Sequence, residues 1–238
     1  MPKQVFFIIA LATLCGCSTQ QFTEIRYPGG GLKERFLLSK DSLREGKAQS
    51  WYPSGQLQSE VDYVEGKGEG KITTWYDTNK KRTEEEVRGG KLHGKGSWWY
   101  ANGVQSEFFE FKEGKANAKW SSWFENGQKS SEREFKDGMR TGRWTTWNKD
   151  GQKINERDYI EGERNGKYTE WFSNGQKREE CEYKEGKLNG KCTTWFENGQ
   201  KVTEGDYKDG KLNGKLIIWD KNGNKTKEGD YKEGEKIK

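Results

Sequence analysis

Proline and histidine are scarce in this chain, and each scarcity limits the structures and sites that the sequence can form. The sequence has three prolines and one histidine, His93, in 238 residues. Proline cannot donate a hydrogen bond to a strand ladder, so its near absence permits long runs of paired strands. His93 has no second histidine or cysteine near it, and no G-x-S-x-G, P-loop or metal-ligand spacing occurs. We therefore expect no cofactor and no metal, and we expect His93 to be a solvated turn residue.

Apolar residues are also few, at 29% hydrophobic against 34% charged. Such a balance alone leans toward disorder, because little apolar surface is available to offset chain entropy. Aromatic residues nevertheless make up 13% of the chain and recur in register, which indicates an ordered structure with a thin core. The net charge of +5 is the small difference between 43 basic and 38 acidic residues. A surface with both charges mixed lacks the basic patch that nucleic-acid binding requires, so we expect no nucleic acid partner.

The chain lacks an apolar run long enough to span a bilayer, which needs about 20 residues. Its longest, Val5–Leu14, has ten residues and fits the core of a secretory signal. The following Leu14–Cys17 resembles the bacterial lipobox. That resemblance implies cleavage after Gly16 and a lipid on Cys17, and Ser18 implies an outer-membrane destination by likeness to Gram-negative lipoproteins. We predict a lipoprotein signal peptide at 1–16 and a tether at 17–26, with an ordinary cleaved signal as the alternative.

One heptapeptide, WFENGQK, occurs at Trp123–Lys129 and again at Trp195–Lys201. The two copies are 72 residues apart, which is three periods of 24. A fixed period of about 20 to 50 residues indicates a repeat array. Eight of the eleven tryptophans fall on this 24-residue grid: Trp51, Trp75, Trp99, Trp123, Trp147, Trp171, Trp195 and Trp219.

Each repeat has the same internal pattern when the grid tryptophan is taken as offset 0. Asn-Gly stands at offsets 3 and 4 of most units, and this pair predicts a two-residue type I′ hairpin turn. Glycine fills offset 15 in every unit and offset 19 in most, with Ala118 as the exception. Each unit is therefore expected to be a strand, an Asn-Gly turn, a second strand and a glycine-bounded turn such as Asp209–Gly214.

The predicted fold is all-β: an elongated single-layer antiparallel β-meander of 24-residue hairpin repeats. We expect a degenerate cap repeat at 27–50. The array at 51–238 would then hold seven full units and one truncated unit.

Strings such as Glu204–Lys215 and Glu182–Lys191 resemble MORN repeats, and the unit with WFENGQK resembles the bacterial variant in the YwqK antitoxin family. The resemblance covers roughly residues 27–238. It implies a single-layer β sheet used for protein binding or assembly, and the antitoxin name implies neutralising a partner by binding it.

Acidic residues recur at offsets 9 and 11, on one face of the strand. Paired carboxylates can serve acid–base catalysis, but a catalytic pair is needed once and these recur in every unit. Lysines or arginines at offsets 13 and 20 are the expected ion-pair partners. We therefore expect that the protein is not an enzyme.

Cys181 and Cys192 depart from the repeat, at offsets 10 and 21 of one unit. In other units these offsets hold Arg133 with Trp144 and Arg157 with Tyr168, as in cation–π pairs. This indicates that the two offsets face each other, although Glu85 with Gly96 does not follow the pattern. The two cysteines would then be opposed, and we predict a disulfide between them in an oxidising compartment, with two free thiols as the alternative.

The aromatic residues at offsets 0 and 1 should point to opposite faces. The eight grid tryptophans are candidate binding residues, unless the long lysine and glutamate side chains cover them. The expected function is an exported, membrane-anchored, non-enzymatic scaffold that binds a protein. The alternative is a structural envelope protein that binds peptidoglycan or another polysaccharide through exposed aromatics.

Overall fold

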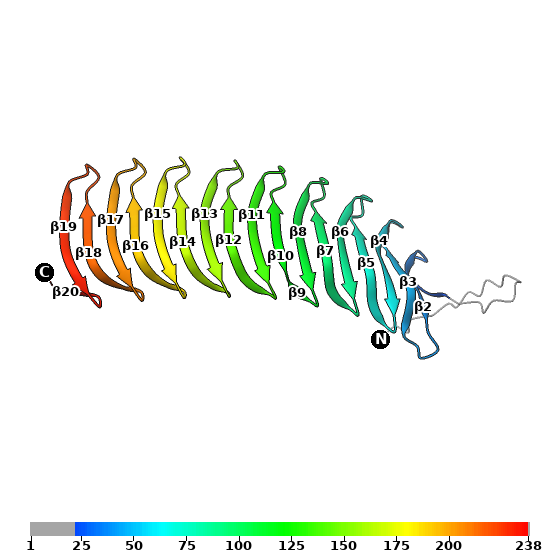
Figure 1. Cartoon of the computed structure of the whole chain (residues 1–238). Helices are drawn as coiled ribbons and strands as arrows, with labels where there is room; N and C mark the ends of the chain where they lie inside the picture. Colours follow the sequence, from blue (N-terminus) through cyan, green and yellow to red (C-terminus); the bar gives the residue numbers. More distant parts are fainter. Residues whose placement is uncertain (1–21, 238) are drawn as a thin grey trace, which may run out of the picture. The chain divides into compact units, whose positions relative to one another are not determined.

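A computed structural model describes residues 22–237, which contain strands and turns but no helix. The chain divides into two compact units, residues 1–115 and 116–238. Each unit is a succession of antiparallel hairpins (Figure 1). None of the described residues lies in a helix that is long and apolar enough to cross a bilayer.

The strands of the first unit are β1 (Phe22–Arg26), β2 (Leu32–Leu38), β3 (Arg44–Trp51), β4 (Leu57–Val64), β5 (Lys67–Trp75), β6 (Lys81–Arg88), β7 (Lys91–Trp99) and β8 (Gln105–Lys112). The two-residue β9 (Lys115–Ala116) lies at the boundary between the units. The strands of the second unit are β10 (Ala118–Trp123), β11 (Lys129–Lys136), β12 (Met139–Trp147), β13 (Lys153–Ile160), β14 (Glu163–Trp171), β15 (Lys177–Lys184), β16 (Lys187–Trp195), β17 (Lys201–Lys208), β18 (Lys211–Trp219), β19 (Lys225–Lys232) and β20 (Glu235–Lys236).

Within each unit, every strand pairs antiparallel with the next along the chain. The predicted meander of hairpin repeats is thus confirmed. Among the described residues of each unit, no helix and no second sheet covers either face. Side chains must therefore bury one another laterally on the two faces of a single layer.

The predicted tether at 17–26 is wrong in its second half. Residues Phe22–Arg26 form β1, which pairs with β2. Glu24 explains this pairing, because its carboxylate accepts hydrogen bonds from Arg35 on β2, at 2.8 Å from Nη2, and from Arg26. The cap repeat at 27–50 then continues through β2 into β3.

The type I′ turn is not where the Asn-Gly pairs predicted it. In the loop after Trp123, Phe124 N donates to Gln128 O at 2.8 Å and Gly127 N donates to Phe124 O at 2.9 Å. Gly127 has φ +84°, whereas Asn126 is not left-handed. This is a three-residue loop, a type I turn closed by a glycine bulge. Asn126 Oδ1 accepts from Gln128 N at 3.0 Å, which favours this turn over the predicted one.

The type I′ turns lie at the other end of each hairpin, at offsets 14 and 15. Glu185 and Gly186 have φ +49° and +77° and join the paired residues Lys184 and Lys187. The glycine-bounded turn is therefore two residues long and not the predicted six, and the second glycine lies inside the following strand.

That second glycine, at offset 19, occupies a β-bulge. Gly190 in β16 has φ +119°, and a Cβ there would collide with the carboxylate of Glu182. The pairing of β15 with β16 shifts register between Cys181 and Tyr183. Glycine is thus required twice over, for its torsion and for the acidic side chain at offset 11 that folds over it.

Candidate binding surfaces

The tryptophan face is the side of each unit that carries the grid tryptophans together with the glutamates at offset 9. Lysines at offset 6 overlie the rings of the following repeat. The distance from Lys Nζ to the ring centroid is 5.8 Å for Lys153 and Trp171 and 5.7 Å for Lys201 and Trp219. All eight grid tryptophans, Trp51, Trp75, Trp99, Trp123, Trp147, Trp171, Trp195 and Trp219, are half-buried.

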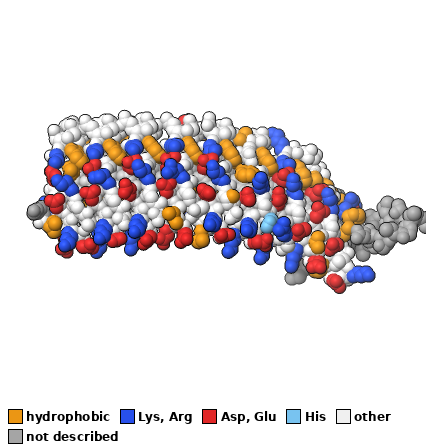
Figure 2. Space-filling model, in the orientation of Figure 1, with side chains coloured by type: hydrophobic (Ala, Val, Ile, Leu, Met, Phe, Trp, Pro, Cys, Tyr) orange, Lys and Arg blue, Asp and Glu red, His pale blue; other side chains and the backbone are white. Residues whose placement is uncertain are grey.

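The same lysines bind the offset-9 glutamates. Lys153 Nζ lies 2.6 Å from Glu156 Oε1, and Lys177 Nζ lies 2.6 Å from Glu180 Oε2. The hydrogen bond from Lys177 holds the pKa of Glu180 below its ordinary value, against the opposing effect of burial. In Figure 2, hydrophobic side chains accordingly alternate with basic and acidic ones instead of forming a broad apolar patch. On this face, ion pairs between lysines and glutamates thus lie over the aromatic rings.

The expected partners of the carboxylates need one correction. Among the described residues, the offset-9 glutamates form ion pairs with lysines at offset 6, as above, and at offset 20, as in Lys47–Glu60 at 2.7 Å, but none with the lysines at offset 13. Offset 13 stands just before the type I′ turn, four residues beyond offset 9. The carboxylates thus have structural partners in repeat after repeat.

The opposite face of the second unit carries a different arrangement, which we call the arginine–aromatic strip. It consists of Arg133 and Phe135 on β11, Arg140 and Trp144 on β12, Arg157 and Tyr159 on β13, and Arg164 and Tyr168 on β14. The ring centroids of Phe135 and Trp144 are 5.1 Å apart, and those of Trp144 and Tyr159 are 4.9 Å apart.

The four guanidinium groups lie over these rings. Arg133 Cζ is 5.8 Å and Arg140 Cζ is 5.1 Å from the Trp144 centroid. Arg157 Cζ and Arg164 Cζ are 5.6 and 6.0 Å from the Tyr168 centroid. The predicted cation–π pairs of Arg133 with Trp144 and Arg157 with Tyr168 are therefore present.

The charges of the strip are not neutralised within the described part of the chain. None of the four arginines forms an ion pair with a described carboxylate, whereas Arg143, on the tryptophan face, binds Asp158 at 2.9 Å. Arg157 Nε is buried and has no hydrogen-bond partner. A buried donor of this kind is open to a hydrogen-bond partner from outside the described chain.

Two glutamates mark the end of the strip. Glu170 and Glu179 stand directly opposite each other on β14 and β15. Burial, and then the charge of Glu170, raises the pKa of Glu179. Tyr168 donates its hydroxyl to Glu170 Oε2 at 2.9 Å, and burial followed by this hydrogen bond raises the pKa of Tyr168 to about 12. The strip therefore ends at this glutamate pair, in which Glu170 is ion-paired with Arg178 at 3.2 Å.

Beyond this border lie Cys181 and Cys192, joined by a disulfide with an S–S distance of 1.96 Å. They are directly opposed, with Cα atoms 4.0 Å apart, and both are buried. Glu179 Oε1 is 3.2 Å from Cys181 Sγ. These three residues form the one metal-capable cluster of the described residues, but sulfurs bonded to each other do not offer thiolate ligands.

The predicted facing of offsets 10 and 21 also holds at Glu85 and Gly96, where the composition had not followed the pattern. Glycine stands at position 96 because the ring of Phe109 occupies the space that a Cβ there would need. Glu85 Oε1 instead accepts a hydrogen bond from Trp98 Nε1 at 2.5 Å.

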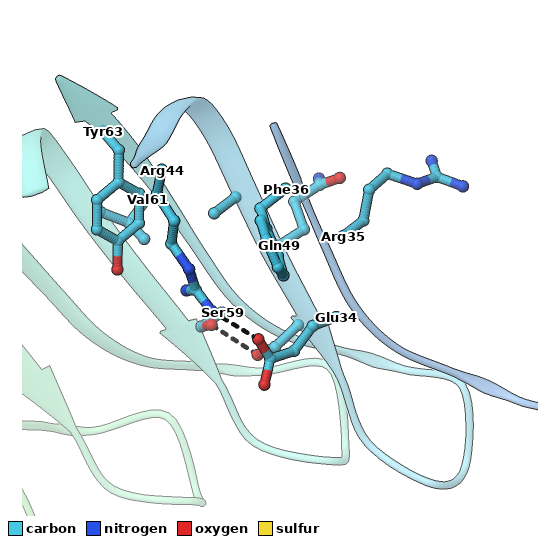
Figure 3. Close-up of a pocket in the computed structure, with 10 residues that line it drawn as sticks. Glu34, Arg35, Phe36, Arg44, Gln49, Ser59, Val61 and Tyr63 are labelled. Carbon is cyan, nitrogen blue, oxygen red and sulfur yellow. Dashed lines mark hydrogen bonds and ion pairs between the residues drawn. The ribbon is translucent and has the colours of Figure 1, made fainter. Parts of the chain in front are cut away.

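The first unit has one arginine in a comparable setting, Arg44 on β3 (Figure 3). Its Cζ lies 4.4 Å from the ring centroid of Phe36 and 5.6 Å from that of Tyr63, beside a pocket of about 220 Å³. Glu34 neutralises it through an ion pair of 2.8 Å. The charge of Arg44 beside this pocket is therefore neutralised by an ion pair, whereas the arginines of the strip form no ion pair with a described carboxylate.

His93 lies in strand β7 and not in the predicted turn. Its Nδ1 is 3.4 Å from Glu113 N, in the type I′ turn of the next repeat. At the same offset, 18, the Glu69 carboxylate accepts from Gly89 N at 2.7 Å. His93 thus occupies a structural position equivalent to that of Glu69.

Cys17, the predicted lipidation site, lies outside the described residues. Arg140 and Arg164 were not singled out from the sequence. A signal for them existed, because three other units place leucine at the same offset, 17: Leu92, Leu188 and Leu212.

Comparison with known families gives one match, described as MORN repeat variant, at residues 44–65, 116–137, 164–185 and 188–209. Each matched segment begins at the first or second residue of a strand and ends at the first residue of the next type I′ turn. No curated protein matches the chain.

Proposed function

Four segments of the chain match the MORN repeat variant, and from this premise we propose that the protein is an exported, lipid-anchored, non-enzymatic scaffold that binds another protein through the arginine–aromatic strip. The observation that carries the proposal is the strip itself. Repeated positions explain the sheet, and the strip is where the repeat is broken by four arginines without carboxylate partners. Arginine and aromatic residues are enriched at the centres of protein interfaces.

The single-layer sheet supports this proposal. In an ordinary sandwich, aromatic residues in such a strip would pack against a second layer. Here no described element of the second unit covers them. Neighbouring side chains of the same layer alone leave Tyr159 only 4% exposed. The strip is thus a preformed surface that needs little reorganisation to bind.

The anchor is proposed from the lipobox-like Leu14–Cys17. Replacing Cys17 by serine should move the protein from the membrane fraction to the soluble fraction of the envelope while leaving the repeats folded. Export would also provide the oxidising compartment in which a Cys181–Cys192 disulfide persists. Retention of Cys17→Ser in the membrane fraction would refute the anchor.

More specifically, we propose that the protein is an immunity-type lipoprotein whose partner is a toxin. The resemblance to the YwqK antitoxin variant supports this proposal. The polysaccharide alternative relied on exposed tryptophans, and it has less support because lysines already overlie most of the grid rings.

The test is affinity capture of the mature protein from the envelope of its host. A protein recovered in stoichiometric amount would support the scaffold. Retention on isolated cell wall, without a protein partner, would instead favour the polysaccharide alternative.

A further inference from the structure

We infer that the strip binds an extended acidic segment of a partner protein, with carboxylates three residues apart. This inference rests on the proposed function and specifies its partner. Its starting point is charge complementarity: four guanidinium groups lie on one face and none forms an ion pair with a described carboxylate, although Arg164 attracts Glu179 at longer range. Guanidinium groups bind carboxylates with two parallel hydrogen bonds, and ring stacking holds them in place beforehand.

The spacing of the arginines specifies the ligand further. Arg133 and Arg157 occupy equivalent positions in β11 and β13, and Arg140 and Arg164 do so in β12 and β14. Members of each pair are two strands apart, which is roughly 10 Å. A polyproline II segment rises about 3.1 Å per residue with three residues per turn, so side chains at i and i+3 lie about 9 Å apart on one side. A segment crossing the strands can therefore present one carboxylate to each member of such a pair.

The rings define the path between the charges. Trp144 on β12 and Tyr159 on β13 lie 4.9 Å apart and offer apolar contact to the residues between the carboxylates. At the end of the strip, Glu170 and Glu179 face each other, and Arg178, the arginine of β15, already forms an ion pair with Glu170 at 3.2 Å, so no arginine without a carboxylate partner continues the strip there. The strip is therefore suited to a short acidic segment and not to a long polyanion running on along the sheet.

The test uses the full mature chain and a fluorescent twelve-residue peptide, Glu-Pro-Thr repeated four times. Comparison peptides carry Gln in place of Glu, or the same residues with the four Glu contiguous. We expect the spaced acidic peptide to bind most tightly in fluorescence anisotropy at about 50 mM salt, and to weaken at higher salt. Arg140→Gln together with Arg164→Gln should weaken binding about tenfold or more.

The matched control is Arg143→Gln with Lys167→Gln, which removes the same charge from exposed positions of the tryptophan face. It should change the affinity by less than about twofold. Equal loss in the control, equal binding of the Gln peptide, or tighter binding of a single-stranded oligonucleotide or of polygalacturonate would each overturn the inference. Unchanged thermal unfolding verifies that each variant is folded.

Affinity capture separates this inference from the proposed function. A partner captured equally by the wild type and by Arg140→Gln/Arg164→Gln would leave the scaffold standing and refute the acidic segment. Peptide binding without any captured protein would instead count against the scaffold.

Discussion

At the residue scale, left-handed backbone torsions recur at four fixed offsets, 4, 14, 15 and 19, and residue identity follows them. Offset 4 is glycine except at Asn79, with φ +62°, and asparagine tolerates this region better than other residues. Offset 14 is acidic in all but one unit, and offset 19 is glycine except at Ala118, with φ +70°. Ala118 is thus the one such position in the described chain that carries a strained alanine.

Ala118→Gly should therefore stabilise the protein. Removing the methyl group relieves about 1 kcal/mol of left-handed strain, part of which the added entropy of the unfolded glycine offsets. The measurement is the free energy of unfolding in urea. Ala116→Gly, at a position without positive φ, is the matched control and should not stabilise. An Ala118→Gly protein less stable than wild type would contradict the bulge geometry.

Glu179 predicts a pH effect of defined sign. Burial and Glu170 raise its folded pKa, so the ionised form is penalised only in the folded state. The penalty is complete above the raised folded pKa, shrinks as pH falls through it, and is absent below the unfolded value of about 4.3.

Glu179→Gln should accordingly raise the unfolding midpoint at pH 7 and make little difference near pH 4. Glu180→Gln is the control of opposite sign, because the pKa of Glu180 is lowered by Lys177 and the ionised form is stabilising. Its variant should be less stable than wild type at pH 7. Equal effects of the two substitutions at pH 7 would refute the assignment.

At the element scale, each hairpin is closed by one three-residue loop and one type I′ turn, and neighbouring hairpins are tied at both ends. In the first unit, Tyr52 and Tyr76 hydroxyls donate to Trp75 O and Trp99 O at 2.9 and 2.8 Å. In the second unit, the amide of Asn174 donates to Glu197 O at 2.9 Å instead. These contacts between repeats take the place of a second layer in holding the sheet together.

Glu161→Asn should stabilise the type I′ turn of β13 and β14. Glu161 has φ +50°, and asparagine adopts this region at lower cost, which is worth roughly 0.5 kcal/mol. Urea unfolding measures the gain. Glu163→Asn is the control, because position 163 follows the same turn and is not left-handed. A gain at 163 and none at 161 would contradict the assignment of the type I′ turn.

The hairpin repeat was predictable from the sequence because its period and its glycines are explicit. The turn types were not, because Asn-Gly fits two different loops and only the number of residues between paired strands decides. The pairing of Cys181 with Cys192 followed from comparing repeats, since register is shared by every unit. β1 was missed because Phe22–Arg26 lies off the repeat, and its pairing depends on Glu24 reaching Arg35 across the sheet.

At the scale of the whole molecule, the two faces have different tasks. The tryptophan face repeats the same lysine, glutamate and ring in most units, and its charges are paired. The arginine–aromatic strip occurs in the second unit, where Arg133, Arg140, Arg157 and Arg164 occupy the variable offsets 10 and 17. Repeated residues build the sheet, and we propose that binding belongs to these variable positions.

The central claim is that a partner protein contacts the strip and not the tryptophan face. The most direct measurement is photo-crosslinking in the host envelope, with a photoreactive amino acid replacing either Arg140 or Lys167. Both positions are exposed, but they lie on opposite faces of the second unit. Our account predicts one discrete crosslinked protein from position 140 and none from position 167. A partner crosslinked from position 167 alone, or the absence of any crosslink from position 140, would contradict it.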